Sequence, residues 1–175
     1  HASETAIVWP WAYRTAAERY RVLTVDGRDI ACAYVELGSP GLPHLAVELP
    51  GLADAADDDL RALARALRYH PALPKGANVN FYTLTGKDAV LLRTYERGVE
   101  DFTCACGTGT GAVVSVLTLA GRVSGTAVRV KMRGGVLTMD VTARDGTARD
   151  LFLTGPARLV ARGEVFPEEL LKNEI

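Results

Sequence analysis

A cysteine followed by a glycine-threonine turn is the part of this sequence with the clearest chemical potential. Cys106 directly precedes G-T-G-T-G-A-V-V-S-V-L-T-L-A, residues 107–120, a run without charged side chains that predicts a helix enclosed by protein. The first N–H groups of a helix have no partner within it, and the peptide dipoles add partial positive charge at that end. A thiolate at Cys106 would be stabilised there, and a substrate carboxylate could bind beside Gly107 and Thr108.

Less functional explanations of this turn also exist. A free cysteine is more often a small core residue, although the glycine turn favours a functional one. Cys104 and Cys106 could begin a metal site, but the only histidines are His1, His44 and His70 and no second cysteine pair follows, so we expect no metal. The turn also lacks the lysine of a phosphate-binding loop and the strand of a dinucleotide fingerprint, which argues against a nucleotide.

Short strands and two helices are expected to position the cysteine turn. The dipeptides D-G at 26–27 and G-G at 134–135 separate apolar runs and predict hairpin turns. Pro71 and Gly121 are expected to end the helices. The alternating or β-branched runs predict strands at 22–25, 30–37, 45–49, 79–84, 90–95, 127–132, 136–142, 151–154 and 159–161.

The first helix is expected over residues 54–69. Three aspartates at 57–59 favour its N-terminus, while Leu60, Leu63 and Leu67 share one face. Arg61, Arg65 and Arg68 are expected to stay in solvent. Many antiparallel strands around the second, apolar helix predict an α+β domain with a barrel-like sheet.

Composition predicts a single soluble domain. The chain has 175 residues, 48% of them hydrophobic, and a formal net charge of -1 with dispersed Lys and Arg, so we expect neither nucleic-acid nor membrane partners. Three cysteines do not describe a disulfide framework and suit a reducing cytoplasm. The start at His1 rather than methionine suggests a fragment, a processed chain or a domain. Trp9 and Trp11 are core residues or mark a partner contact.

Several segments resemble the diaminopimelate epimerase family. T-Y-E-R-G-V-E-D-x-T-x-A-C-G-T-G resembles its second catalytic-cysteine motif, which is highly specific. Four supporting segments follow the order of the family from about residue 20 onward: V-L-T-V-D-G-R at 22–28, G-L-P-H at 41–44, L-P-K-G-A-N-V-N-F at 73–81 and L-T-G-P-A at 153–157.

The resemblance implies an enzyme of two pseudo-symmetric halves, each contributing one cysteine to a site between them. The first cysteine belongs to M-C-G-N-G-x-R in the family, and nothing here matches it, because Cys32 lies in I-A-C-A-Y-V. We therefore expect the C-terminal half: an epimerase-like domain over 1–162 and a tail, 163–175, returning toward the missing N-terminal half. That half is the expected partner, and a homodimer is left open.

The resemblance also implies the chemistry. Family members interconvert LL- and meso-diaminopimelate in lysine biosynthesis without pyridoxal phosphate, metal or any other cofactor, by proton transfer between two cysteines. Glu96 would hold the substrate ammonium and help set thiol protonation, and Arg97 would pair with the distal carboxylate. Asn78 would join the distal recognition site. His44 could tune the thiols. Otherwise Glu96 and Arg97 are an exposed strand-end pair, Asn78 is a turn residue and His44 a loop residue.

Two departures from the family pattern affect the substrate. Leu42 stands where the G-N-P-H turn has an asparagine, and Phe102 where the family has a polar residue. A leucine offers no hydrogen bond to a distal polar group, so an epimerase for a different amino acid stays open. So do a carboxylate-base isomerase of the same fold, like the phenazine-biosynthesis isomerases, and a non-catalytic binding module. Cys106 argues against the isomerase, and the missing first cysteine favours the module.

Overall fold

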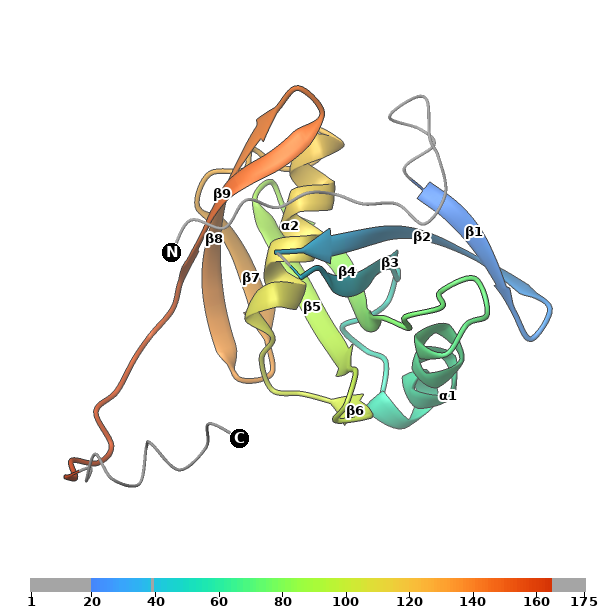
Figure 1. The fold of residues 1–175 in the computed structure, drawn as a ribbon, viewed down its shortest axis with the longest axis horizontal. Helices are drawn as coiled ribbons and strands as arrows, with labels where there is room; N and C mark the ends of the chain where they lie inside the picture. The colour runs from blue at the N-terminus through green and yellow to red at the C-terminus, as the bar shows by residue number, and fades with distance from the viewer. Residues whose placement is uncertain (1–19, 39, 165–175) are drawn as a thin grey trace.

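One mixed sheet forms most of the protein (Figure 1). The computed structural model describes residues 20–38 and 40–164. The strands are β1 (Tyr20–Val25), β2 (Arg28–Leu37), β3 (Leu42–Glu48), β4 (Asn78–Gly86), β5 (Ala89–Glu96), β6 (Asp101–Phe102), β7 (Val128–Met132), β8 (Gly135–Arg144) and β9 (Thr147–Thr154), and the helices are α1 (Asp57–Arg68) and α2 (Gly107–Leu119).

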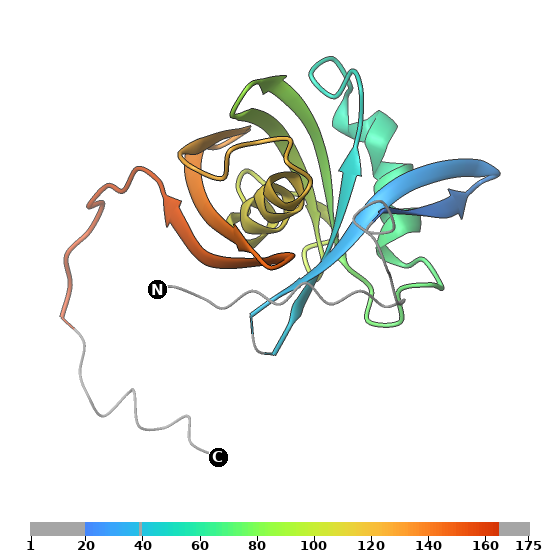
Figure 2. The same cartoon turned by 90° about the horizontal axis from the view of Figure 1, so that it is seen from above.

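The strand order is β1-β2-β3-β4-β5-β7-β8-β9, with the short β6 paired to β5. Neighbours are antiparallel except β3–β4 and β5–β7. Each parallel pair is joined through a helix, because the chain must return to the same end of the sheet. Figure 2 shows the sheet curving around α2, with α1 on the opposite side. This arrangement confirms the α+β class.

The curved sheet encloses α2 on several sides. The helix packs against β2, β3, β4, β8 and β9, and its residues from Gly109 to Leu117 are all buried. Val128, Val130 and Met132 alternate with exposed residues along β7, as expected for a strand with one face in the core. The apolar sequence of α2 is therefore explained by its surroundings.

Most predicted element boundaries agree with the structure. Both hairpin turns are confirmed, and Asp26 and Gly27 have the positive φ angles, 48° and 73°, of a tight turn. The bounds of α2 differ from the prediction by one residue, and Gly121 follows it with φ 69°. The first helix begins three residues later than expected, because Asp54 and Ala55 form a turn in which both N–H groups bond to the Gly51 carbonyl.

Two predictions about exposure and pairing are wrong. Arg68 was expected in solvent, but its side chain is only 11% exposed and forms an ion pair with Glu100 at 3.0 Å. Residues 159–161 were expected to be a strand, but the described chain from 155 to 164 has no regular structure, and Leu159 and Val160 are 85% and 91% exposed. The chain leaves the sheet at Pro156, which has no N–H to continue a ladder.

Parts of the sequence lie outside the described residues. Trp9 and Trp11 belong there, as does almost all of the expected tail, 163–175.

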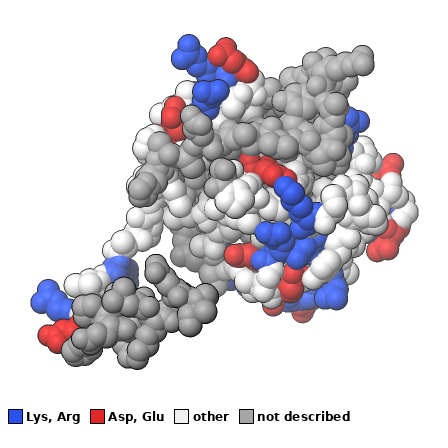
Figure 3. All heavy atoms as spheres, viewed as in Figure 1, with Lys and Arg blue, Asp and Glu red and all other residues white. Residues whose placement is uncertain are grey.

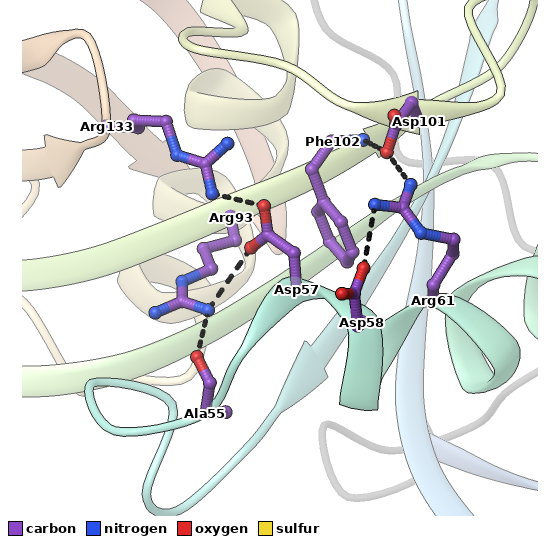
Figure 4. A network of polar contacts seen from close by, with 8 residues as sticks. All are labelled: Ala55, Asp57, Asp58, Arg61, Arg93, Asp101, Phe102 and Arg133. Atoms are coloured by element: carbon purple, nitrogen blue, oxygen red, sulfur yellow. Dashed lines mark hydrogen bonds and ion pairs between the residues drawn. The ribbon is translucent and has the colours of Figure 1, made fainter.

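Charged side chains link α1 to the sheet. Asp57 lies between Arg93 and Arg133, and Arg61 bonds to both Asp58 and Asp101 (Figure 4). On the face in Figure 3, Lys and Arg side chains lie beside Asp and Glu side chains. These contacts fix the start of α1 against β5 and the turn after β7.

Candidate functional site

Cys106 is the N-cap residue of α2. Its backbone is extended, with φ −140° and ψ 106°, and its Sγ accepts a hydrogen bond from the Gly109 N–H at 3.3 Å. The Thr108 hydroxyl lies 3.5 Å from the same sulfur. Cys106 is 7% exposed. The thiol thus occupies the position of a capping acceptor, where unpaired N–H groups and the helix dipole favour negative charge.

The turn before Cys106 is held by the hairpin between β7 and β8. The Gly134 N–H donates to the Cys104 carbonyl at 2.7 Å. A Cβ at Gly134 would lie 2.9 Å from that oxygen, so only glycine permits this approach without a shift. The position of the thiol therefore depends on a turn that follows it by almost thirty residues in the chain.

The sheet brings most of the predicted site residues to the face that covers α2. His44 pairs with Asn78 across β3 and β4, and Asn80 pairs with Thr94 across β4 and β5. Paired residues share a face, and side chains two apart on one strand do so as well. Glu96 follows Thr94 by two residues and lies on this face.

Asn80 is a site residue that the sequence analysis missed. It is fully buried, donates to the Leu45 carbonyl at 3.1 Å, and accepts from the Thr94 hydroxyl at 2.9 Å. Its amide nitrogen also lies 3.2 Å from His44 Nδ1. A Cβ added at Gly109 would collide with Asn80 Oδ1. Asn80 therefore connects His44 to the first turn of α2. The available signal was the alternation in N-V-N-F, which places two asparagines on one face.

His44 is a strand residue with no exposed surface, so the loop interpretation is wrong. Strand β3 begins at Leu42, three residues before the prediction. Burial lowers the pKa of His44 to about 3, and the positive charge of Arg97 acts in the same direction. The imidazole is therefore neutral at ordinary pH. Its Nε2 is buried without a hydrogen-bond partner among the described residues.

Asn78 holds the chain at Arg97. It is 3% exposed, which excludes a surface turn residue. Its Oδ1 accepts from the Arg97 N–H at 2.8 Å and its Nδ2 donates to the Pro43 carbonyl at 3.2 Å. The Arg97 guanidinium donates to the Lys75 carbonyl at 3.1 Å and is exposed. In the described part of the chain, no hydrogen bond or ion pair is recorded for the half-buried Glu96 carboxylate.

The other two cysteines differ from Cys106 in position. Cys104 is exposed in the same turn. Cys32 pairs with Val47, one residue out of phase with His44 and Ala46, so its side chain lies on the face opposite α2. Burial raises the pKa of Cys32 to about 12. Within residues 20–38 and 40–164, no second thiol therefore faces Cys106 across a space that a substrate could occupy.

A cavity of about 450 Å³ opens beside the N-terminus of α2. Gly107 and Thr108 line it together with Leu37, whose pairing partner on β3 is Leu42. Leu151, Leu153 and Met139 complete an apolar wall. The predicted carboxylate-binding residues therefore border an accessible space, and Leu42 lies next to its wall.

Metal and membrane features were also examined in the described chain. No group of three or more His, Cys, Asp or Glu side chains there is arranged to hold a metal ion. No helix in the same residues is long and apolar enough to cross a membrane.

Comparison with known proteins gives a consistent family. A family model described as diaminopimelate epimerase matches residues 37–160. The chain is 38% identical to the diaminopimelate epimerase of Aquifex aeolicus (strain VF5) over 152 residues, 86% of this chain and 51% of that protein. It is 39% identical to the diaminopimelate epimerase of Archaeoglobus fulgidus over 145 residues, 83% of this chain and 47% of that protein.

A solved structure of a probable proline racemase from Agrobacterium radiobacter K84 is similar over 65% of this chain and 38% of that chain, with 19% identity and a TM-score of 0.45. The chain spans about half the length of the curated relatives it matches. The family model covers most of the chain and includes the cysteine turn. This protein belongs to the diaminopimelate epimerase family.

Proposed function

We propose that the chain is the C-terminal half of a cofactor-independent diaminopimelate epimerase, with Cys106 as one of two proton-transfer groups. The observation that carries this proposal is the Cys106 sulfur at the N-cap of α2, bonded to the Gly109 N–H, in a member of this family. The curved sheet around α2 would be one of two pseudo-symmetric barrel-like halves. A cytoplasmic location suits a site whose thiol must stay reduced.

The reaction needs two groups on opposite faces of the substrate. Without an electron sink, the carbanion formed at the α-carbon must be stabilised by the site itself. A thiolate on one face removes the α-proton while a thiol on the other face supplies one. N–H groups at Gly107 and Thr108 would hold the α-carboxylate and stabilise the charge that develops on it. In this scheme Cys106 occupies one face, and the N-terminal half supplies the other.

Substrate recognition is assigned to the polar residues on the same side of the sheet. Glu96, without a recorded partner in the described chain, would bind the α-ammonium group and influence thiol protonation. The exposed Arg97 guanidinium would bind the distal carboxylate. Asn78 supports Arg97 through its backbone N–H and keeps one amide hydrogen for the distal group. His44 would act near the thiols as a neutral group.

A second candidate is a binding half-module without turnover. It is favoured by the position of Cys32 on the opposite face of the sheet, which leaves one thiol in the site of the described chain. Such a module would bind an amino acid through Glu96, Arg97 and the helix N-terminus. The two candidates differ in whether a complementary half restores turnover.

The test is a complementation assay. The chain is mixed with the N-terminal half of a related epimerase, and inversion of LL-diaminopimelate is followed by chiral chromatography. We expect inversion only when both halves are present. The chain alone should be inactive, because one base cannot pass a proton between faces. Binding of diaminopimelate by the assembled halves without inversion would favour the module, and inversion by the chain alone would contradict both candidates.

A further inference from the structure

The surroundings of His44 define which of its two ring nitrogens carries the proton. The Asn80 amide nitrogen lies 3.2 Å from His44 Nδ1. An amide nitrogen can donate a hydrogen bond but cannot accept one. A proton on Nδ1 would therefore place two donors against each other, whereas an unprotonated Nδ1 accepts the contact.

The orientation of the Asn80 amide is itself fixed. Its nitrogen lies 3.1 Å from the Leu45 carbonyl and 3.3 Å from the Asn78 carbonyl, two groups that only accept hydrogen bonds. Its oxygen accepts from the Thr94 hydroxyl at 2.9 Å. Rotating the amide by half a turn would bring its oxygen against both carbonyls. The amide hydrogens are thus shared among three acceptors, one of which is His44 Nδ1.

The remaining nitrogen of His44 is unusual. Nε2 is buried and has no partner among the described residues. Buried N–H donors are nearly always paired in folded proteins, so an unpaired one calls for an acceptor from outside the described chain. The neutral ring supplies one such donor, because burial keeps His44 uncharged.

We infer that Asn80 is a positioning residue that fixes His44 as the neutral imidazole with its proton on Nε2, so that His44 offers a hydrogen-bond donor to an acceptor brought by the substrate or by the second half. The chemical class of this acceptor is an oxygen such as a carboxylate or a backbone carbonyl. In this arrangement His44 donates a hydrogen bond and does not accept a proton from a thiol. The link to the substrate rests on the proposed function, but the assignment of the proton does not.

The experiment measures the tautomer directly in the 175-residue chain. Long-range proton–nitrogen correlation spectra of the nitrogen-15-labelled protein distinguish a protonated ring nitrogen from an unprotonated one. We expect the His44 signals, assigned through bonds to its backbone, to show an unprotonated Nδ1 and a protonated Nε2. A protonated Nδ1 would overturn the inference.

Two variants test whether Asn80 sets this state. Asn80→Asp places an acceptor at Nδ1 and should move the proton from Nε2 to Nδ1. Thr94→Val removes the hydroxyl behind Asn80 and leaves the contact with His44, so it should keep the proton on Nε2. A folded Asn80→Asp chain with the proton still on Nε2 would refute the positioning role.

A smaller substitution covers the case in which Asn80→Asp does not fold. Asn80→Ser removes the donor without adding a carboxylate, and it should give signals of both tautomers. A single Nε2–H tautomer in that variant would also refute the role. None of these spectra requires turnover, so the inference can fail while the epimerase proposal stands, and the reverse.

Discussion

Individual residues on the α2 face differ from their expected roles mainly through burial. His44 was weighed as a loop residue, but β3 extends to Leu42 and takes His44 into the core with no exposed surface. A hydrogen-bonded position for its ring then depends on Asn80, which two residues of strand alternation bring beside it. Burial also decides its charge.

Burial of His44 predicts a loss of stability in acid. In the unfolded chain the pKa is about 6.5, and in the folded chain it falls to about 3. The unfolded state therefore binds a proton first, so the contribution of His44 is fully present above about pH 6.5 and is lost as the pH falls toward 3. Between pH 7 and pH 5 the loss should be about 2 kcal/mol.

Urea unfolding at these two pH values measures the effect. Carboxylates titrate in both proteins, so the comparison between the wild type and His44→Gln isolates the histidine. The variant should lose less stability than the wild type over the interval. An equal loss in both proteins would show that His44 is not held neutral in the folded state.

Leu42 predicts weakened recognition of diaminopimelate. Leu42→Asn in the assembled enzyme should lower the Michaelis constant for diaminopimelate roughly two- to tenfold with little change in kcat, because the added hydrogen bond is made equally in the ground and transition states. Leu42→Ala is the control, since it removes the leucine without adding an amide. If both variants change the constant alike, the amide is not the cause; if a smaller amino acid is the better substrate of the parent enzyme, the substrate assignment is wrong.

At the scale of elements, the close contact between α2 and the sheet sets the position of the thiol. Gly109 faces Asn80, and a Cβ there would also lie 3.0 Å from Thr94 Oγ1 and 3.1 Å from Cys106 Sγ. Gly107, at the same helix end, would meet only the tip of Leu153, a half-exposed side chain that can rotate away. The two glycines form a matched pair.

Gly109→Ala should destabilise the fold by about 1–3 kcal/mol, because the helix must move away from β4 and β5. Gly107→Ala should leave stability within about 0.5 kcal/mol of the wild type. Guanidinium unfolding of both variants measures the difference. Similar losses in the two variants would mean that α2 does not approach the sheet as closely as described.

Local sequence signals predicted some elements and could not predict others. The apolar run after Cys106 and the D-G and G-G turns carry their own instructions, and they were located within a residue or two. The parallel pairs β3–β4 and β5–β7 were not predicted, because parallel pairing depends on where the helical connections return the chain. Strand β6 has only two residues and shows no period. Asn80 gained its importance from tertiary contacts with His44, Thr94 and Gly109.

At the scale of the whole molecule, the chain offers one thiol to the proposed site. Cys106 lies at the open end of α2 beside a cavity, while Cys32 lies on the opposite face of the sheet with its pKa raised to about 12. The curated relatives are about twice as long as this chain. The site therefore needs a second half, and the central claim is that Cys106 is one of two groups that move the α-proton.

The most direct measurement uses the assembled enzyme in deuterium oxide, with wild-type chain and with Cys106→Ala. Wild-type turnover should invert LL-diaminopimelate and place deuterium at the α-carbon of the product, as followed by mass spectrometry and chiral chromatography. Cys106→Ala should abolish inversion, while Cys104→Ala, two residues earlier in the same turn, should retain it. Inversion at the wild-type rate by Cys106→Ala would contradict the account.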